Sequence, residues 1–304
     1  MAKQPSAVIA AFFANLGIGA AKFTAFALTG SSSMLAESFH SVADTGNQAL
    51  LLLGHRRAQR RATPEHPFGY ARERYFWAFV VAMILFALGA VFSLWEGYSK
   101  LRSPHPIESP MWAFAVLGIA LVAESVALRI AVRTANESRT GSWWHYIRTT
   151  KDAGNAVVLL EDAAAETGLV VALLGVGLSV VTGDARWDAM GSLAIGALLA
   201  FVSMLLAVEM RSLLIGEAAS PADYGRVRRA IEDESALVSI IELRTMHLGP
   251  SELMVAAKVQ LRSDLDFDAV ARTVNAMEAR VREAVPTAAH IFVEPARARS
   301  ATGG

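Results

Sequence analysis

The chain has 304 residues, of which 54% are hydrophobic and 18% charged, and its mean hydropathy is +0.38. This composition is too apolar for an ordinary soluble domain and is typical of a multi-pass membrane protein. The formal net charge is zero, so no global basic field favours nucleic acid as a partner, and the lack of cysteine excludes disulfides, thiolate metal ligands and cysteine nucleophiles.

Six apolar segments are each long enough to cross a bilayer, whose hydrocarbon core of about 30 Å needs about 20 apolar residues per helix. They cover roughly residues 7–28, 34–53, 76–95, 111–132, 156–181 and 188–208. The short polar stretch before the first segment has no cleavage-site pattern, so this segment is expected to remain in the mature protein. The sequence therefore predicts six transmembrane helices.

The loops carry their positive charge unequally. The connection HRRAQRRATPEHPFGYARER, between the second and third segments, holds six arginines, and residues 129–151 hold four arginines and a lysine. Because loops rich in arginine and lysine stay in the cytoplasm, both connections are expected there, which puts both termini inside the cell. A multi-pass protein of the bacterial cell (inner) membrane is the expected location.

The chain becomes polar after Arg211, which predicts a transport domain over 1–211 and a cytoplasmic domain over 212–304. PADYGRVRRAIEDE and DFDAVARTVNAMEARVREA have helical patterns, whereas SIIELRTMHL, ELMVAAKVQL and HIFVEP have the patterns of strands. The first two strands are joined by a turn at Gly249. The order α-β-β-α-β predicts a small soluble α+β domain with helices on one face of a sheet, followed by a disordered tail.

A polar stripe runs along the second apolar segment. Glu37, His40, Asp44 and Asn47 recur at spacings of three and four residues, which places them on one face of a helix. Each ionisable group at bilayer depth costs at least about 2.5 to 3.5 kcal/mol on insertion scales. The stripe is therefore expected to face protein partners or a water-filled path.

The fifth apolar segment carries Glu161, Asp162 and Glu166 in apolar surroundings. Asp162 and Glu166 are one helical turn apart and would repel each other unless a cation lay between them. One imidazole nitrogen with three carboxylate oxygens fills a tetrahedral zinc shell, and the same donors also bind manganese, cobalt, ferrous iron or nickel. No prosthetic group is expected.

Simpler interpretations exist for the same residues. A lone intrahelical histidine is commonly a satisfied core residue, and intramembrane carboxylates can relay protons without a metal. Glu124 and Asn15 are weaker candidates, because isolated polar residues often only bond a neighbouring helix. No histidine lies in a His-Glu-x-x-His pattern, which excludes a zinc protease of that type, and the chain is not expected to be an enzyme.

Four stretches, GSSSMLAESFHSVADTGNQALLLLG, HPFGYARERYFW, LLEDAAAETG and DAMGSLAIG, resemble the cation diffusion facilitator family, most closely the branch that includes the mitochondrial zinc transporter of animals. The resemblance implies a homodimer that exchanges zinc or a related ion for protons at a four-ligand site between spans two and five. His40 and Asp44 fall on the span-two ligands and Asp162 on a span-five ligand. Val158 occupies the position of the family's fourth ligand, a histidine.

Two replacements for this missing ligand remain open. Glu161 is adjacent to Asp162, and Glu166 would move the ligand pair one turn along the helix. The alignment favours Asp162, whereas the depth counted from the ends of the spans favours Glu166.

Three further histidines are candidates for accessory metal binding, and no regulated multi-zinc cluster is expected in the C-terminal domain. His66 lies where some family members bind a second zinc ion, but Tyr70 replaces the partner histidine, so a structural or headgroup-facing role is favoured. In the C-terminal domain, Lys258, an Ala-Val-Ala run and Phe292 stand at the family's metal-sensing positions. His247 and His290 remain as candidate ligands. The resemblance thus predicts a mainly dimerising domain.

The preferred function is exchange of a divalent metal ion, with zinc as the transported substrate, for protons. Two alternatives belong to other classes. The chain could be a non-transporting scaffold or metal sensor that keeps the fold, in line with the valine at position 158, or a proton-coupled carrier of an organic cation.

Overall fold

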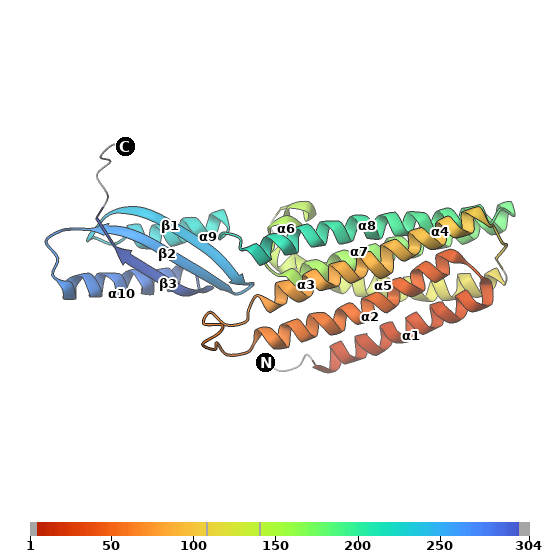
Figure 1. Cartoon of the computed structure of the whole chain (residues 1–304), viewed down its shortest axis with the longest axis horizontal. Coiled ribbons are helices and arrows are strands. Elements are labelled where there is room, and N and C mark those ends of the chain that lie inside the picture. The colour runs from red at the N-terminus through yellow and green to blue at the C-terminus, as the bar shows by residue number, and fades with distance from the viewer. Residues whose placement is uncertain (1–4, 108, 140, 298–304) are drawn as a thin grey trace. The chain divides into compact units, whose positions relative to one another are not determined.

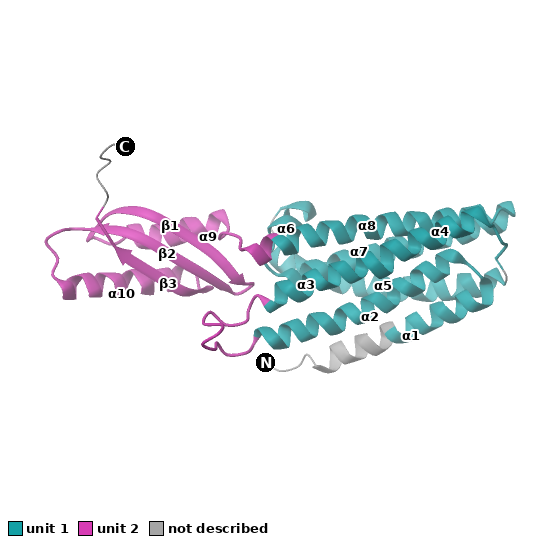
Figure 2. Cartoon of the chain, in the orientation of Figure 1, with its two compact units in different colours: residues 1–58, 73–211 teal, residues 59–72, 212–304 magenta. Residues whose placement is uncertain are grey.

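The computed structural model describes residues 5–107, 109–139 and 141–297, with side chains from Leu16 onward (Figure 1). These residues form two compact units, one made of residues up to 58 together with 73–211, the other of 59–72 together with the residues from 212 onward (Figure 2). The first unit contains the helices α1 (Pro5–Thr29), α2 (Ser32–Ala58), α3 (Glu73–Ile84), η1 (Leu85–Val91), α4 (Phe92–Arg102), α5 (Pro110–Ser138), α6 (Trp143–Thr149), α7 (Ala153–Thr182) and most of α8 (Arg186–Ile215).

Each of the six predicted apolar segments lies within a helix. Four helical rods are long and apolar enough to cross a membrane, namely Glu73–Arg102, Pro110–Ser138, Ala153–Thr182 and Arg186–Ile215. The rod Glu73–Arg102 consists of α3, the π-helical turn η1 and α4. Within α1, Leu16–Thr29 forms a shorter apolar helix, and α2 falls outside this group because polar side chains interrupt its apolar surface. The chain is therefore a mostly helical membrane protein.

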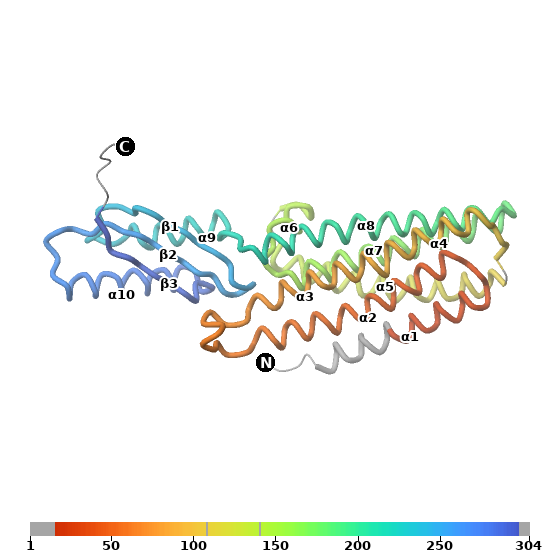
Figure 3. The backbone as a smooth tube through the Cα atoms, viewed as in Figure 1, coloured from red at the N-terminus to blue at the C-terminus, as the bar shows by residue number. Residues whose placement is uncertain are grey.

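The helices extend beyond the apolar segments at both ends. For example, α2 continues through His55, Arg56 and Arg57, which the hydropathy pattern assigned to a loop. Hydropathy marks the apolar part of a helix, whereas backbone hydrogen bonds continue into polar residues. The backbone trace shows α1 and α2 side by side, and these two helices contact each other extensively (Figure 3).

Asp188 accepts several hydrogen bonds at one end of the helical unit. Its carboxylate accepts hydrogen bonds from the backbone N–H of Ser32 (2.8 Å), the Ser31 hydroxyl (2.8 Å) and Lys100 Nζ (2.8 Å). All four side chains are fully buried. The carboxylate therefore caps the N-terminus of α2 and ties it to α4 and α8, with the lysine supplying the charge that a buried carboxylate needs.

The second unit contains α9 (Pro221–Glu232), β1 (Leu237–Gly249), β2 (Glu252–Leu261), α10 (Phe267–Ala284) and β3 (Ala288–Pro295), in the predicted order. The sheet order is β1-β2-β3, with β1 antiparallel and β3 parallel to the central β2. Alternate residues of β2, such as Val255 and Val259, are fully buried in a core that the sheet shares with α9 and α10. Val227 of α9 and Val281 of α10 are buried in the same core. The three-stranded C-terminal domain is confirmed.

The segment 59–72, which lies inside the predicted range 1–211, groups with this C-terminal unit. Phe68 packs edge-on against His290 and Phe292, with ring centroids 5.4 Å and 6.5 Å away. Ala71 lies so close to Gly249 that a Cβ at Gly249 would overlap the Ala71 methyl group. A side chain larger than hydrogen is therefore excluded at Gly249 unless this contact moves.

Candidate metal-binding site

The polar stripe of α2 is buried. Glu37, His40 and Asn47 have no exposed surface, and Asp44 is 7% exposed. These residues recur every three or four positions, so they share one face of the helix. Helices α1 and α7 pack against α2 and contribute hydrogen-bond partners to this face, Lys22 to Glu37 and Glu161 to Asn47.

Helix α7 brings a carboxylate to the stripe. Asn47 Nδ2 donates a 3.0 Å hydrogen bond to Glu161 Oε1, and Glu161 is 4% exposed. The side chains of Asp44 and Glu161 lie close enough to share a hydrogen bond when one of them carries a proton. The structure thus brings Glu161 to the predicted His40 and Asp44 pair.

Several atoms at this place are buried without a hydrogen-bond partner among the described residues. They are both ring nitrogens of His40 and Oδ1 of Asp44. His40 Nδ1 and Asp44 Oδ1 are 3.4 Å apart, which is ion-pair distance when the ring is protonated. A buried polar group without a partner costs about 1 to 3 kcal/mol. Imidazole nitrogen and carboxylate oxygen are also the donors that zinc takes when no thiolate is present.

The candidate ligands are near one another but do not form a compact cluster among the described residues. Among the described side chains, no three histidine, aspartate or glutamate groups converge closely enough to enclose an ion. His40 and Asp44 form a close pair, and Glu161 approaches Asp44 from α7. A bound cation would have to draw these groups together.

The two other acidic candidates of α7 face different neighbours. Asp162 is only partly buried, and Glu161 and Glu124 are the charged groups that act on it. Glu166 Oε1 accepts a 2.7 Å hydrogen bond from Ser125 of α5. Neighbouring positions on a helix are about 100° apart, so Glu161 and Asp162 cannot both face α2 directly. Val158, one turn before Asp162, is partly buried.

Sequence reasoning missed a buried lysine beside the site. Lys22 of α1 lies 3.1 Å from Glu37 Oε2 and donates a 2.7 Å hydrogen bond to Ser41, and both charged side chains are fully buried. Lys22 is a single cation within the first apolar segment, and a charged residue in such a segment indicates a functional or structural partner. The sequence shows Lys22 as a charged residue within an apolar segment, but it does not identify Glu37 as the partner of Lys22.

Of the two weaker candidates, Glu124 and Asn15, the structure describes the side chain of Glu124 only. Glu124 of α5 is 7% exposed and acts electrostatically on Glu37, Asp44 and Glu161. The side chain of Asn15 lies outside the described part of the chain, and so does the predicted disordered tail 296–304 apart from its first two residues, of which Ala296 donates a 2.8 Å backbone hydrogen bond to Val259.

The accessory histidines are dispersed. His66 is exposed and its ring lies 4.5 Å from that of Tyr70. His247 is buried with Nδ1 3.4 Å from the Gly249 carbonyl oxygen, and His290 packs against Phe68. Lys258 pairs with Glu294 at 2.9 Å, and Phe292 is 52% exposed. In the described ranges these residues do not form a metal-binding cluster.

The chain is similar to known transporters. The cation efflux transmembrane domain matches residues 8–215. The Xenopus laevis protein named proton-coupled zinc antiporter SLC30A9, mitochondrial, is 36% identical over 81% of this chain and 44% of its own length. Its Homo sapiens counterpart is 34% identical over 81% of this chain and 43% of its own length. The magnetosome protein MamB of Magnetospira is 23% identical over 94% of both chains.

The chain spans less than half the length of the animal relatives it matches. The domain match nevertheless covers all of the helical unit from residue 8 onward, including the polar stripe and Glu161. The predicted relationship is confirmed, and the chain belongs to the cation diffusion facilitator family, near its animal mitochondrial branch.

Proposed function

We propose that this protein exchanges a divalent metal cation, preferably zinc, for protons across a membrane at a site between α2 and α7. His40, Asp44 and Glu161 supply the ligands. The observation that carries the proposal is the set of buried ligand atoms on His40 and Asp44 that have no hydrogen-bond partner among the described residues, beside a second carboxylate, that of Glu161. Zinc is favoured because the animal relatives are named as zinc antiporters and because the donors combine imidazole with carboxylate.

Exchange follows from competition for the same atoms. A metal ion binds the deprotonated imidazole and carboxylates, and protons displace it when they bind these groups. A site that opens alternately to the two sides of the membrane then couples the two fluxes without a separate proton path.

The proposed topology has six membrane-crossing helices: α1, α2, the rod Glu73–Arg102, α5, α7 and α8. The arginine-rich loops and both termini lie in the cytoplasm of a bacterial cell, and the C-terminal unit dimerises the protein. The loop charges support the orientation. The family resemblance supports the homodimer.

Proteoliposomes test the function. With an inside-acidic pH gradient, wild-type protein is expected to show saturable zinc uptake accompanied by proton efflux. His40→Ala and Asp44→Ala are expected to lower both fluxes at least about tenfold, because each removes a ligand. Saturable zinc flux that neither substitution changes would exclude this site. A folded wild-type protein without metal flux would instead support a scaffold or sensor.

The α7 ligand is identified by comparing three matched substitutions, Glu161→Gln, Asp162→Asn and Glu166→Gln. Each removes one negative charge with little change in volume. We expect Glu161→Gln to reduce zinc flux at least about tenfold and the other two to retain most of it. Flux that is lost in Asp162→Asn or Glu166→Gln and kept in Glu161→Gln would assign the ligand to that other carboxylate.

A further inference from the structure

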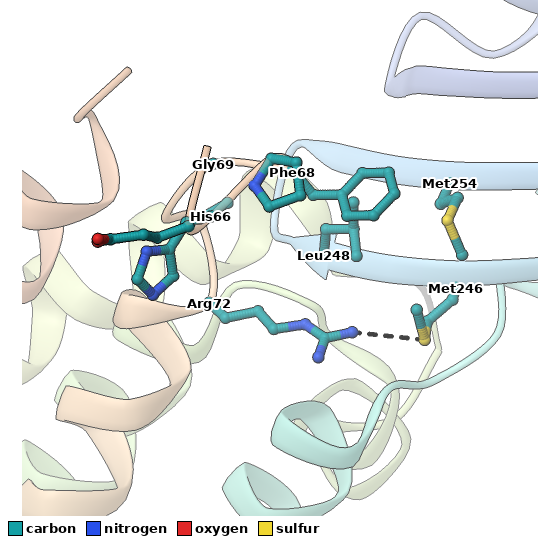
Figure 4. A pocket seen from close by; sticks show the side chains of 10 residues that line it. His66, Phe68, Gly69, Arg72, Met246, Leu248 and Met254 are labelled. Atoms are coloured by element: carbon teal, nitrogen blue, oxygen red, sulfur yellow. Dashed lines mark hydrogen bonds between the residues drawn. The ribbon is translucent and has the colours of Figure 1, made fainter. Parts of the chain in front are cut away.

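The C-terminal unit contains a pocket of about 380 Å³ between the segment 59–72 and the first two strands. Its walls are mostly apolar and include Phe68, Met246, Leu248 and Met254, with Arg72 and Glu65 as charged lining residues (Figure 4). The volume and the combination of apolar walls with a few polar groups are typical of small-molecule sites. All of these residues belong to one compact unit, so the pocket is separate from the intramembrane site.

Arg72 forms no ion pair among the described residues, although it is a charged lining residue of this pocket. Its Nη2 contacts the Met246 sulfur at 3.4 Å, a weak acceptor, and its Nε is buried without a hydrogen-bond partner among the described residues. No described carboxylate forms an ion pair with Arg72, although Glu65 lines the same pocket. A partly buried guanidinium is normally paired, so this one indicates a site for an anion.

The pocket walls are held by close backbone contacts. A Cβ at Gly216 would overlap the Met246 side chain, and Gly216 has a φ of 117°, which disfavours any other residue. A Cβ at Gly249 would likewise overlap the Ala71 side chain. The Phe68 ring packs edge-on against the His290 ring. The pocket is therefore formed by packed residues of the sheet and the segment 59–72.

We propose that this pocket binds an amphipathic anion, with a carboxylate or phosphate head on Arg72 and an apolar tail between Phe68, Met246, Leu248 and Met254. The guanidinium excludes a metal cation and selects an anionic head, whose two oxygens match its paired N–H groups. The two methionines adapt to tails of different shape. Such a ligand can come from the membrane, as a fatty acid or lysophospholipid, or from solution, as a short-chain acid.

The test uses the full-length protein in phosphatidylcholine nanodiscs and a photoactivatable decanoate carrying a diazirine. We expect crosslinks to peptides that contain residues 68–72 and 246–254. Unlabelled decanoate is expected to compete at least about tenfold better than decanol, which has a comparable tail without the charge. Equal competition by decanol, or crosslinks elsewhere, would overturn the proposal.

Substitutions test the role of Arg72. Arg72→Gln is expected to lower labelling at least about tenfold, whereas Arg61→Gln, an exposed arginine of the same segment outside the pocket, leaves it unchanged. Met254→Trp fills the pocket from β2 and keeps Arg72, so it gives a second test if Arg72→Gln does not fold. Labelling that survives in folded Arg72→Gln or in Met254→Trp contradicts the site.

A soluble competitor distinguishes the two sources. Competition by hexanoate added in solution would assign a soluble ligand. Competition by decanoate alone, supplied in the bilayer, would assign a membrane-derived ligand.

Discussion

The side-chain amide of Asn47 donates a 3.0 Å hydrogen bond to Glu161, and this bond joins α2 to α7 one turn away from Asp44. Glu161 thereby keeps one oxygen on the amide while its carboxylate lies beside Asp44. A hydrogen bond to a charged group in a buried setting is both strong and directional. Asn47 is therefore placed to orient the proposed ligand Glu161 without being a ligand itself.

Replacing Asn47 by alanine tests this orienting role. We expect Asn47→Ala to raise the KM for zinc at least about tenfold, because a hydrogen bond to a charged group is worth about 1.5 to 3 kcal/mol. Initial zinc flux into proteoliposomes over a range of zinc concentrations gives the value. The matched control is Ser38→Ala, since the Ser38 hydroxyl bonds only the Met34 carbonyl of its own helix. Equal effects of the two substitutions would contradict the role of Asn47.

Gly168 of α7 permits the close approach of Glu37. A Cβ at Gly168 would overlap Glu37 Oε1, so Gly168→Ala is expected to destabilise the helical unit by about 1 to 3 kcal/mol. Gly118→Ala on α5 is the control, because nothing lies near its Cβ position, and it should be neutral or slightly stabilising. Thermal unfolding in detergent, followed by size-exclusion chromatography, compares them. Higher stability of Gly168→Ala than of Gly118→Ala would refute the contact.

The buried pair of Lys22 and Glu37 predicts strong energetic coupling. Removing one partner leaves the other charge buried, so Lys22→Met alone is expected to destabilise the protein by about 3 to 5 kcal/mol. The double variant Lys22→Met with Glu37→Gln is expected to recover much of this loss, because no charge is left unpaired.

A double-mutant cycle of unfolding free energies measures that coupling. The exposed pair of Arg228 and Glu232, 2.8 Å apart, is the control, and Arg228→Ala should change stability little. Additive effects at Lys22 and Glu37 would rule out the expected coupling.

In the C-terminal unit, a 2.6 Å hydrogen bond from Arg280 lowers the pKa of Glu234 below its ordinary value of 4.5. Because the pKa is lower in the folded state, the stability that the pair contributes is present above this ordinary value. It is lost as the pH falls through the lowered folded-state pKa. The pair links α10 to the end of α9, so protonation of Glu234 should loosen that contact.

Hydrogen exchange of backbone amides in α10 checks this dependence. At neutral pH we expect Glu234→Gln to exchange roughly two- to fivefold faster than wild type, after correction for intrinsic rates. The difference should disappear as the pH falls through the lowered pKa of Glu234. A difference that stays constant with pH would show that the charge of Glu234 does not contribute.

Local patterns in the sequence were enough to predict the helical segments, the α-β-β-α-β order of the C-terminal unit and the stripe of Glu37, His40 and Asp44. Each depends on hydrophobic periodicity or on residue spacing within one element. The family followed from motifs within such elements. The helix ends were less predictable, as at His55 and Arg57, because backbone hydrogen bonding continues where hydropathy stops.

The contacts between elements could not be predicted from these local patterns and were determined by the tertiary structure. The sequence placed Glu161, Asp162 and Glu166 on one helix, but only the packing of α7 against α2 determined that Glu161 meets Asp44, because neighbouring positions differ by about 100° around a helix. Packing also paired Lys22 with Glu37 and enclosed Arg72 in an apolar pocket. Periodicity determines which face of an element is polar, but three-dimensional packing alone determines which residues that face meets.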